Sequence, residues 1–185
     1  AVEMIDIQFR DNECNGVCGA FLSRRNTLRR IEIEGNTHVG QTQDIPAILY
    51  APPNSETTAQ RITARNNAGS LLLVEEATVT LSNSIFSQNV AAPIDEDGDD
   101  FGASINLLNA SALIEGCSFQ GNEGDFGPAI FISQSDLNLT DCTFEENSAV
   151  LGGGLNVRNQ SSVLITNCVF TLNFATEDGD RKSVV

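Results

Sequence analysis

Residues 137–157, LNLTDCTFEENSAVLGGGLNV, decide the fold. Side chains alternate between the two faces of a β-strand, so Leu137 and Leu139 lie on one face of a short strand. After a polar turn, Cys142 and Phe144 fall on that same face of a second strand, which Asn147 ends. A glycine-backed third strand follows. Such a unit has one apolar side and no partner within itself, so it must stack on similar units.

The same unit recurs along nearly the whole chain. The ladder asparagines are residues 12, 36, 67, 89, 122, 147 and 173, which gives successive steps of 24, 31, 22, 33, 25 and 26 residues. The full triplets are Cys142/Phe144/Asn147, Cys168/Phe170/Asn173, Cys117/Phe119/Asn122 and Ser84/Phe86/Asn89, and the weaker ones are Ile62/Ala64/Asn67, Ile31/Ile33/Asn36 and Ile7/Phe9/Asn12. Seven copies predict a repeat solenoid of about seven coils.

The period and the residue types indicate which solenoid this is. A repeat of about 22–26 residues made of three short strands fits a β-coil, whereas helical repeats are longer. Leucine-rich repeats have a similar period, but their fixed leucine pattern is absent. The sequence therefore predicts an all-β fold, a parallel β-helix with three strands per coil.

Two motifs carry a resemblance to known proteins. Phe144-Glu145-Glu146-Asn147 is followed by Gly153-Gly154-Leu155, and Phe119-Gln120-Gly121-Asn122 by Gly127-Pro128-Ala129-Ile130. These residues resemble the pectin-lyase-like right-handed parallel β-helix, and the pairing of FxxN with GG-x-(I/L) is similar to repeats of polymorphic outer-membrane proteins and related surface adhesins. The resemblance implies an architecture and says little about activity.

The repeats span residues 1–185 as a single domain. Neither end has the polar or helical character expected of a solenoid cap, which normally covers apolar surface and unpaired strand edges. We therefore expect a segment of a longer solenoid or one subunit of a filament. Its expected partners are neighbouring solenoid segments or other protein subunits at the open ends.

Charge narrows the range of partners. The formal net charge is −15, and residues 66–157 carry fourteen acidic side chains with no Lys or Arg. Nucleic acid is an unsuitable partner because phosphate binding needs clustered cations. No window approaches the roughly 18 apolar residues of a membrane span. Arginines gather near the start, which suggests head-to-tail packing of opposite charges.

An acidic insertion in the fourth coil is the candidate metal site. Asp95, Asp97, Asp99 and Asp100 surround a glycine, and calcium takes six to eight oxygen ligands that such carboxylates supply. The full spacing of an EF-hand loop is absent. The alternative is a solvated acidic loop, and no other cofactor is expected.

The five cysteines divide into two groups. Cys117, Cys142 and Cys168 share one repeat position, which predicts an inward column about 4.8 Å apart. Neighbours at that spacing suit a disulfide poorly, so we expect free thiols that fill the core. Cys14 and Cys18 lie in one loop and are a candidate disulfide; with His38 they would form a metal site that lacks a fourth ligand.

The ladder asparagines are expected to be structural. Amides stacked at one repeat position, at Asn67, Asn89, Asn122, Asn147 and Asn173, donate to one another and satisfy turn carbonyls. Three N-glycosylation sequons begin at Asn109, Asn138 and Asn159, and they favour secretion modestly.

No pattern indicates a catalytic site. Relatives of this fold that cleave polyuronates use cationic residues together with calcium or paired aspartates, whereas the central coils here have no Lys or Arg. The chain has no tryptophan and one tyrosine, so the usual platforms for sugar stacking are missing. We therefore expect a non-catalytic extracellular or cell-surface rod, stalk or adhesive filament component, with glycans among its candidate ligands. The competing class is a carbohydrate-active enzyme, a polysaccharide lyase or a glycoside hydrolase with two carboxylates.

Overall fold

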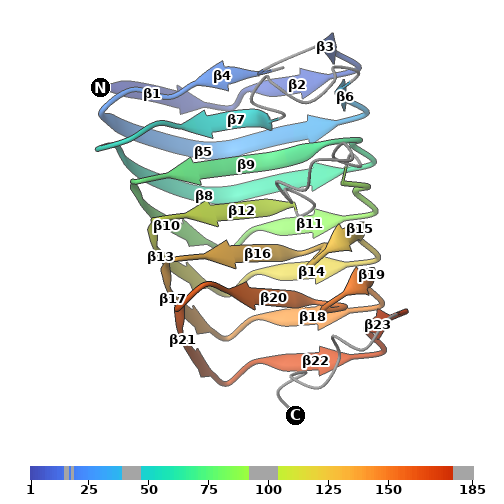
Figure 1. The fold of residues 1–185 in the computed structure, drawn as a ribbon. Helices are drawn as coiled ribbons and strands as arrows, with labels where there is room; N and C mark the ends of the chain where they lie inside the picture. Colours follow the sequence, from blue (N-terminus) through green and yellow to red (C-terminus); the bar gives the residue numbers. More distant parts are fainter. Residues whose placement is uncertain (15–16, 18, 39–46, 92–103, 177–185) are drawn as a thin grey trace.

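The computed structural model describes residues 1–14, 17, 19–38, 47–91 and 104–176. These residues contain strands and no helix, and every strand pairing between them is parallel. The chain winds into a rod of stacked coils that runs from the N-terminal to the C-terminal end (Figure 1). This arrangement confirms the predicted all-β fold, a parallel β-helix of stacked coils.

Successive coils place their strands in four columns that run along the rod. The first two columns form one 12-stranded sheet, in which β5 and β8 belong to both columns because they run through the bend between them. The first column holds β1 (Val2–Ile5), the first halves of β5 (Arg25–Glu34) and β8 (Glu56–Arg65), β10 (Thr78–Ser82), β13 (Ser111–Glu115), β17 (Asp136–Thr140) and β21 (Ser162–Thr166). The second column holds β2 (Gln8–Arg10), the second halves of β5 and β8, β11 (Ile85–Ser87), β14 (Ser118–Gln120), β18 (Thr143–Glu145) and β22 (Val169–Thr171).

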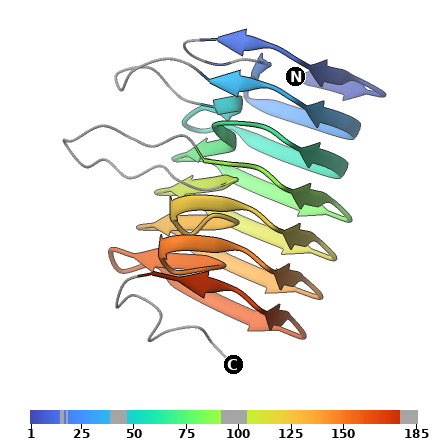
Figure 2. The same ribbon diagram turned by 90° about the vertical axis from the view of Figure 1, so that its right-hand side faces the viewer.

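The other side of each coil carries two further columns, which are visible from the side in Figure 2. The third column is short and lies directly after the ladder asparagine; it holds β3 (Glu13–Cys14), β6 (Thr37–His38), β15 (Glu123–Phe126), β19 (Ser148–Leu151) and β23 (Phe174–Ala175), with single bridges at Ala68 and Val90 between them. The fourth column holds β4 (Ala20–Phe21), β7 (Ala47–Ala51), β9 (Ser70–Glu75), β12 (Ile105–Leu108), β16 (Ile130–Ser133) and β20 (Leu155–Arg158).

The coil count agrees with the sequence, and the number of strands per coil is one higher. Six coils have a strand in the fourth column, and a seventh is described as far as Thr176. The added strand is the short third column. It forms because the backbone carbonyl of a ladder asparagine accepts a hydrogen bond from the residue that follows the ladder asparagine of the next coil. The N–H of Phe174, for example, donates to the carbonyl of Asn147 at 2.8 Å.

Inward side chains stack in columns that fill the coil. Phe86, Phe119, Phe144 and Phe170 lie over one another with ring centroids 5.1, 4.8 and 4.5 Å apart and nearly parallel planes. Phe119 and Phe144 are wholly buried. Since full burial of a phenylalanine stabilises a fold by about 3 kcal/mol, this column is a main source of rigidity in coils four to seven.

Tight turns of left-handed backbone separate the columns. One such turn precedes the cysteine position and another precedes the ladder asparagine, for example at Asp141 (φ 53°) and Glu146 (φ 53°). Asn, Asp and Gly tolerate this conformation best, whereas other residues adopt it at a cost of about 1–2 kcal/mol. Residues in the first of these turns are Asp6, Arg30, Arg61, Asn83, Gly116, Asp141 and Asn167.

A second apolar cluster lies on the outer face of the fourth column. Tyr50 and Leu73 are almost fully buried there with Ala47, and Val17 and Leu108 pack against them. The hydroxyl of Tyr50 donates to the carboxylate of Glu75 at 2.6 Å. Burial raises the pKa of Tyr50 to about 12, and this hydrogen bond is the second cause of the shift.

Candidate functional site

The asparagine ladder is the most extended polar arrangement among the described residues. Asn147 shows its pattern: Oδ1 accepts from the backbone N–H of Asn122 at 3.0 Å and from its Nδ2 at 2.9 Å. Nδ2 of Asn147 donates to Oδ1 of Asn173 at 2.8 Å and to the carbonyl of Phe119 at 3.0 Å. Each amide therefore joins three coils.

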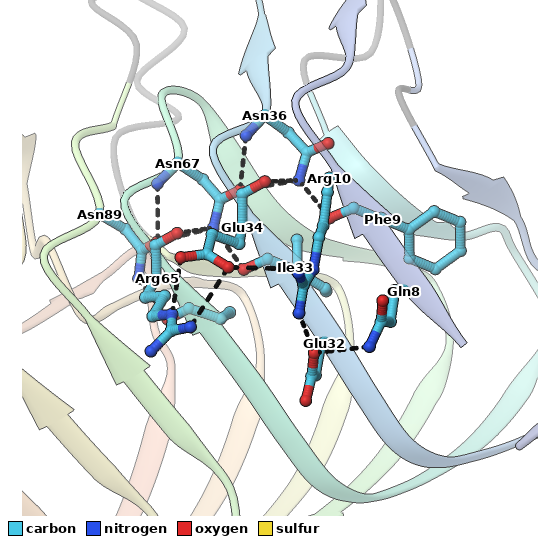
Figure 3. Close-up of polar contacts among 11 residues, drawn as sticks. Gln8, Phe9, Arg10, Glu32, Ile33, Glu34, Asn36, Arg65, Asn67 and Asn89 are labelled. Carbon is cyan, nitrogen blue, oxygen red and sulfur yellow. Dashed lines mark hydrogen bonds and ion pairs between the residues drawn. The ribbon is translucent and has the colours of Figure 1, made fainter. Parts of the chain in front are cut away.

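The ladder continues without a break from the first coil to the seventh. Six side-chain links, each 2.6–3.0 Å long, join Asn12, Asn36, Asn67, Asn89, Asn122, Asn147 and Asn173. Figure 3 shows the row at Asn36, Asn67 and Asn89. The predicted ladder residues are thus brought together, and their donors and acceptors serve one another.

The ladder has a direction. Every link donates toward the following coil, so Asn12 offers Oδ1 at one end and Asn173 offers its backbone N–H at the other. Neither group has a partner among the described residues. A further coil would supply an acceptor at one end and a donor at the other.

The three repeat cysteines form an inward column of free thiols. Cys117 and Cys142 are buried, and the backbone N–H of Cys142 donates to Sγ of Cys168 at 3.4 Å. The hydrogen bond with Cys117, followed by burial, raises the pKa of the Cys142 thiol, and burial raises the pKa of Cys168. The same hydrogen bond lowers the pKa of Cys117. The raised pKa keeps the Cys142 and Cys168 thiols in the unreactive neutral form, which suits core filling.

Ser84 takes the place of cysteine in the fourth coil. Its Oγ accepts from the backbone N–H of Ile62 at 3.0 Å and donates to the carbonyl of Ser82 at 2.9 Å. The column therefore serves backbone hydrogen bonding as well as packing.

Cys14 and His38 face each other across the first two coils in the register of β3 and β6. Cys14 is disulfide-bonded, so its sulfur is not available as a thiolate ligand. The predicted partner, Cys18, lies outside the described residues, and the pairing stays a prediction. No group of three or more His, Cys, Asp or Glu side chains suited to a metal occurs in the part of the chain that is described.

The calcium candidates cannot be placed. Asp95, Asp97, Asp99 and Asp100 fall within 92–103, outside the described residues. Calcium binding there stays a prediction.

Ion pairs lie in rows on the outer surface of the first three coils. Arg10 pairs with Glu32 at 2.6 Å, and Arg65 pairs with Glu34 at 3.0 Å (Figure 3). A hydrogen bond from Arg30 lowers the pKa of Asp6, and one to Glu32 raises the pKa of Arg10. Because these side chains are largely exposed, solvent and salt screen the pairs and their effect on stability is small.

A shallow groove of about 350 Å³ lies beside these pairs, along the bend of the 12-stranded sheet. Arg61 makes no ion pair with any described residue, whereas Arg30 and Glu32 are already paired. The groove thus offers one unneutralised guanidinium beside neutral hydrogen-bonding groups. Its lining consists of Asp6, Gln8, Arg30, Ile31, Glu32, Arg61 and Thr63. Sequence reasoning missed it because the insertions in coils two and three hide which residues are neighbours.

The asparagines of the three sequons are all exposed. Asn109 and Asn159 lie in turns after the fourth column with φ of 47° and 49°, whereas Asn138 lies in the middle of β17. In the described segments, no helix has the length and apolarity needed to cross a bilayer.

Comparison with known proteins agrees with this geometry. Residues 96–179 match the family model described as right handed beta helix region, which is slightly less than half of the chain. Over 111 residues, 60% of the chain, the sequence is 26% identical to metabotropic glutamate receptor-like protein R of Dictyostelium discoideum. The aligned part spans 7% of that protein's length. Both the fold and the matched family model are consistent with a pectin-lyase-like β-helix repeat.

Proposed function

We propose that this chain is a non-catalytic β-helical segment of a secreted or cell-surface protein, where it acts as a rigid rod, stalk or adhesive spacer. The observation that carries the proposal is the unbroken asparagine ladder, which uses its polar groups to join every coil to the next. Seven coils at about 4.8 Å each make a rod roughly 33 Å long. The likeness to a small part of a receptor-like protein supports a location at the cell surface.

The partners that we propose are further coils at the two outer layers, from the same polypeptide or from another. The inward apolar side chains of the seventh coil, Val163, Ile165 and Phe170, are only partly buried. Their counterparts in the sixth coil, Leu137, Leu139 and Phe144, are at most 1% exposed. Phe170 stacks on Phe144 on one side, and a following coil would cover its other face. The directional ladder adds a polar match, because one outer layer offers acceptors and the other offers donors.

A carbohydrate-active enzyme is the second candidate, and the groove of the first three coils is the observation that favours it. Its carboxylates belong to Asp6 and Glu32, which are the types of group that glycoside hydrolysis uses. Both, however, form ion pairs with arginines. The hydrogen bond from Arg30 lowers the pKa of Asp6, which opposes a role of that carboxyl as general acid.

Turnover assays decide between the two candidates. The chain is incubated with a panel of neutral and acidic polysaccharides, with and without calcium, and new reducing ends and unsaturated products are measured. We expect no product above that of a heat-denatured sample. Turnover that Glu32→Gln abolishes, while the urea midpoint is unchanged, would establish the enzyme and overturn the structural proposal.

A further inference from the structure

The middle of the outer face of the first column carries an unusual neighbourhood. Leu113, Asn138 and Leu164 lie side by side on β13, β17 and β21, in register. Leu137 and Leu139, which flank Asn138 in the chain, are in the core, so the side chain of Asn138 points outward. Leu113 is 41% exposed and Leu164 is 62% exposed. An amide therefore stands between two leucines that face water.

The amide of Asn138 is available for modification. It makes no hydrogen bond with the described residues, and Thr140 completes the sequon on the same strand face. By contrast, Nδ2 of Asn159 donates to Oγ of Ser133 at 2.9 Å. Asn109 lies at a left-handed turn directly after β12, where the register of β12 continues to Glu76 and Gln134 rather than to a leucine.

We propose that Asn138 carries an N-linked glycan whose first sugar covers Leu113 and Leu164. A sugar ring has apolar C–H faces as well as hydroxyls, so it shields apolar side chains while it stays hydrated. Neighbouring strands lie about 4.8 Å apart, which places both leucines within reach of a ring attached to Nδ2. Two exposed leucines on a sheet face are then explained without a protein partner.

The modification is an ordinary glycosyl transfer. The donor is an oligosaccharide linked through its anomeric carbon to a polyprenyl diphosphate. A bond forms between that carbon and Nδ2 of Asn138, and the bond from the carbon to the diphosphate oxygen breaks. The diphosphate leaves with the electron pair, and Nδ2 gives one proton to a base of the transferase. The inference rests on the proposed secreted or surface location, because the transfer takes place in the secretory pathway.

Site occupancy is measured on the whole chain secreted from eukaryotic cells behind a cleavable signal sequence. Secreted and cell-retained protein are both digested, and the peptide that contains residue 138 is weighed before and after treatment with a peptide N-glycosidase. We expect a glycan on this peptide, and we expect both Asn138→Gln and Thr140→Val to remove it. Asn109→Gln and Asn159→Gln are the matched controls that leave it in place. An unmodified peptide in both fractions overturns the proposal.

The shielding role has its own readout. Sedimentation velocity should show more self-association for Asn138→Gln than for the glycosylated parent, while Asn109→Gln sediments like the parent. Adding Leu113→Ser and Leu164→Ser to Asn138→Gln should restore the sedimentation of the glycosylated parent. Equal self-association of parent and Asn138→Gln would contradict the shielding. Glycan occupancy and polysaccharide turnover are measured in separate experiments. An unmodified Asn138 would therefore overturn the glycan proposal and leave the proposed rod intact, whereas turnover would overturn the rod and leave the glycan intact.

Discussion

Replacing Asn147 by alanine removes one link from the middle of the ladder. The side chain is wholly buried and takes part in four hydrogen bonds, two as acceptor from Asn122 and one each as donor to Asn173 and Phe119. Each net hydrogen bond contributes about 1 kcal/mol, and a buried group left without a partner costs about 1–3 kcal/mol. We therefore expect Asn147→Ala to lower the free energy of unfolding by about 4 kcal/mol.

Asn138→Ala is the matched control, because it makes the same chemical change in the same coil at an exposed residue that has no hydrogen bond to the described residues. It should change stability by less than about 0.5 kcal/mol. Urea unfolding is followed by far-UV circular dichroism on unglycosylated protein, and the two midpoints are compared with that of the parent. An Asn147→Ala midpoint as close to the parent as that of Asn138→Ala would refute the structural role of the ladder.

Three further predictions concern single residues. The chain has one tyrosine and no tryptophan, so its phenolate absorbance reports Tyr50 alone, with an expected midpoint near pH 12; a midpoint near pH 10 would contradict the burial. Because this folded pKa lies above the ordinary value of 10.0, the stability that Tyr50 contributes is complete below pH 10 and is lost as the pH rises through 12. Iodoacetamide should alkylate Cys168 first in native protein and reach Cys117 and Cys142 only after unfolding, as peptide mass spectrometry would show; equal labelling of all three would contradict the column. Gly121→Ala should lower stability by about 1 kcal/mol through its φ of 60° alone, because the nearest atom to the new Cβ lies 3.8 Å away, and an unchanged urea midpoint would show that the left-handed turn carries no strain.

The fold was predictable because the repeat keeps its most specific residues in the interior. Cys142, Phe144 and Asn147 hold fixed offsets, and a core of small or stacked side chains tolerates few alternatives. The largest differences in length fall after the ladder asparagine, and single-residue differences occur after the fourth column. Steps as uneven as 22 and 33 residues therefore still bring Asn67, Asn89 and Asn122 together.

The turns and the outer surface could not be predicted in the same way. Arg30 and Arg61 adopt left-handed backbone, although nothing in an arginine indicates this, because the packing of the coil overrides local preference. The neighbours of an outward side chain lie one coil away, so the groove at Arg61 and the leucines beside Asn138 appear only once the register is known. Calcium binding by Asp95, Asp97, Asp99 and Asp100 stays a prediction from the sequence.

The stacking of successive coils is tested most directly by the positions of the sulfur atoms in a crystal, located by anomalous scattering. Cys117, Cys142 and Cys168 should appear as three sulfurs in a row, each about 4.8 Å from the next, with the ring of Phe144 between those of Phe119 and Phe170. Sulfurs scattered through the molecule would contradict the stacked coil, and with it the proposed rod.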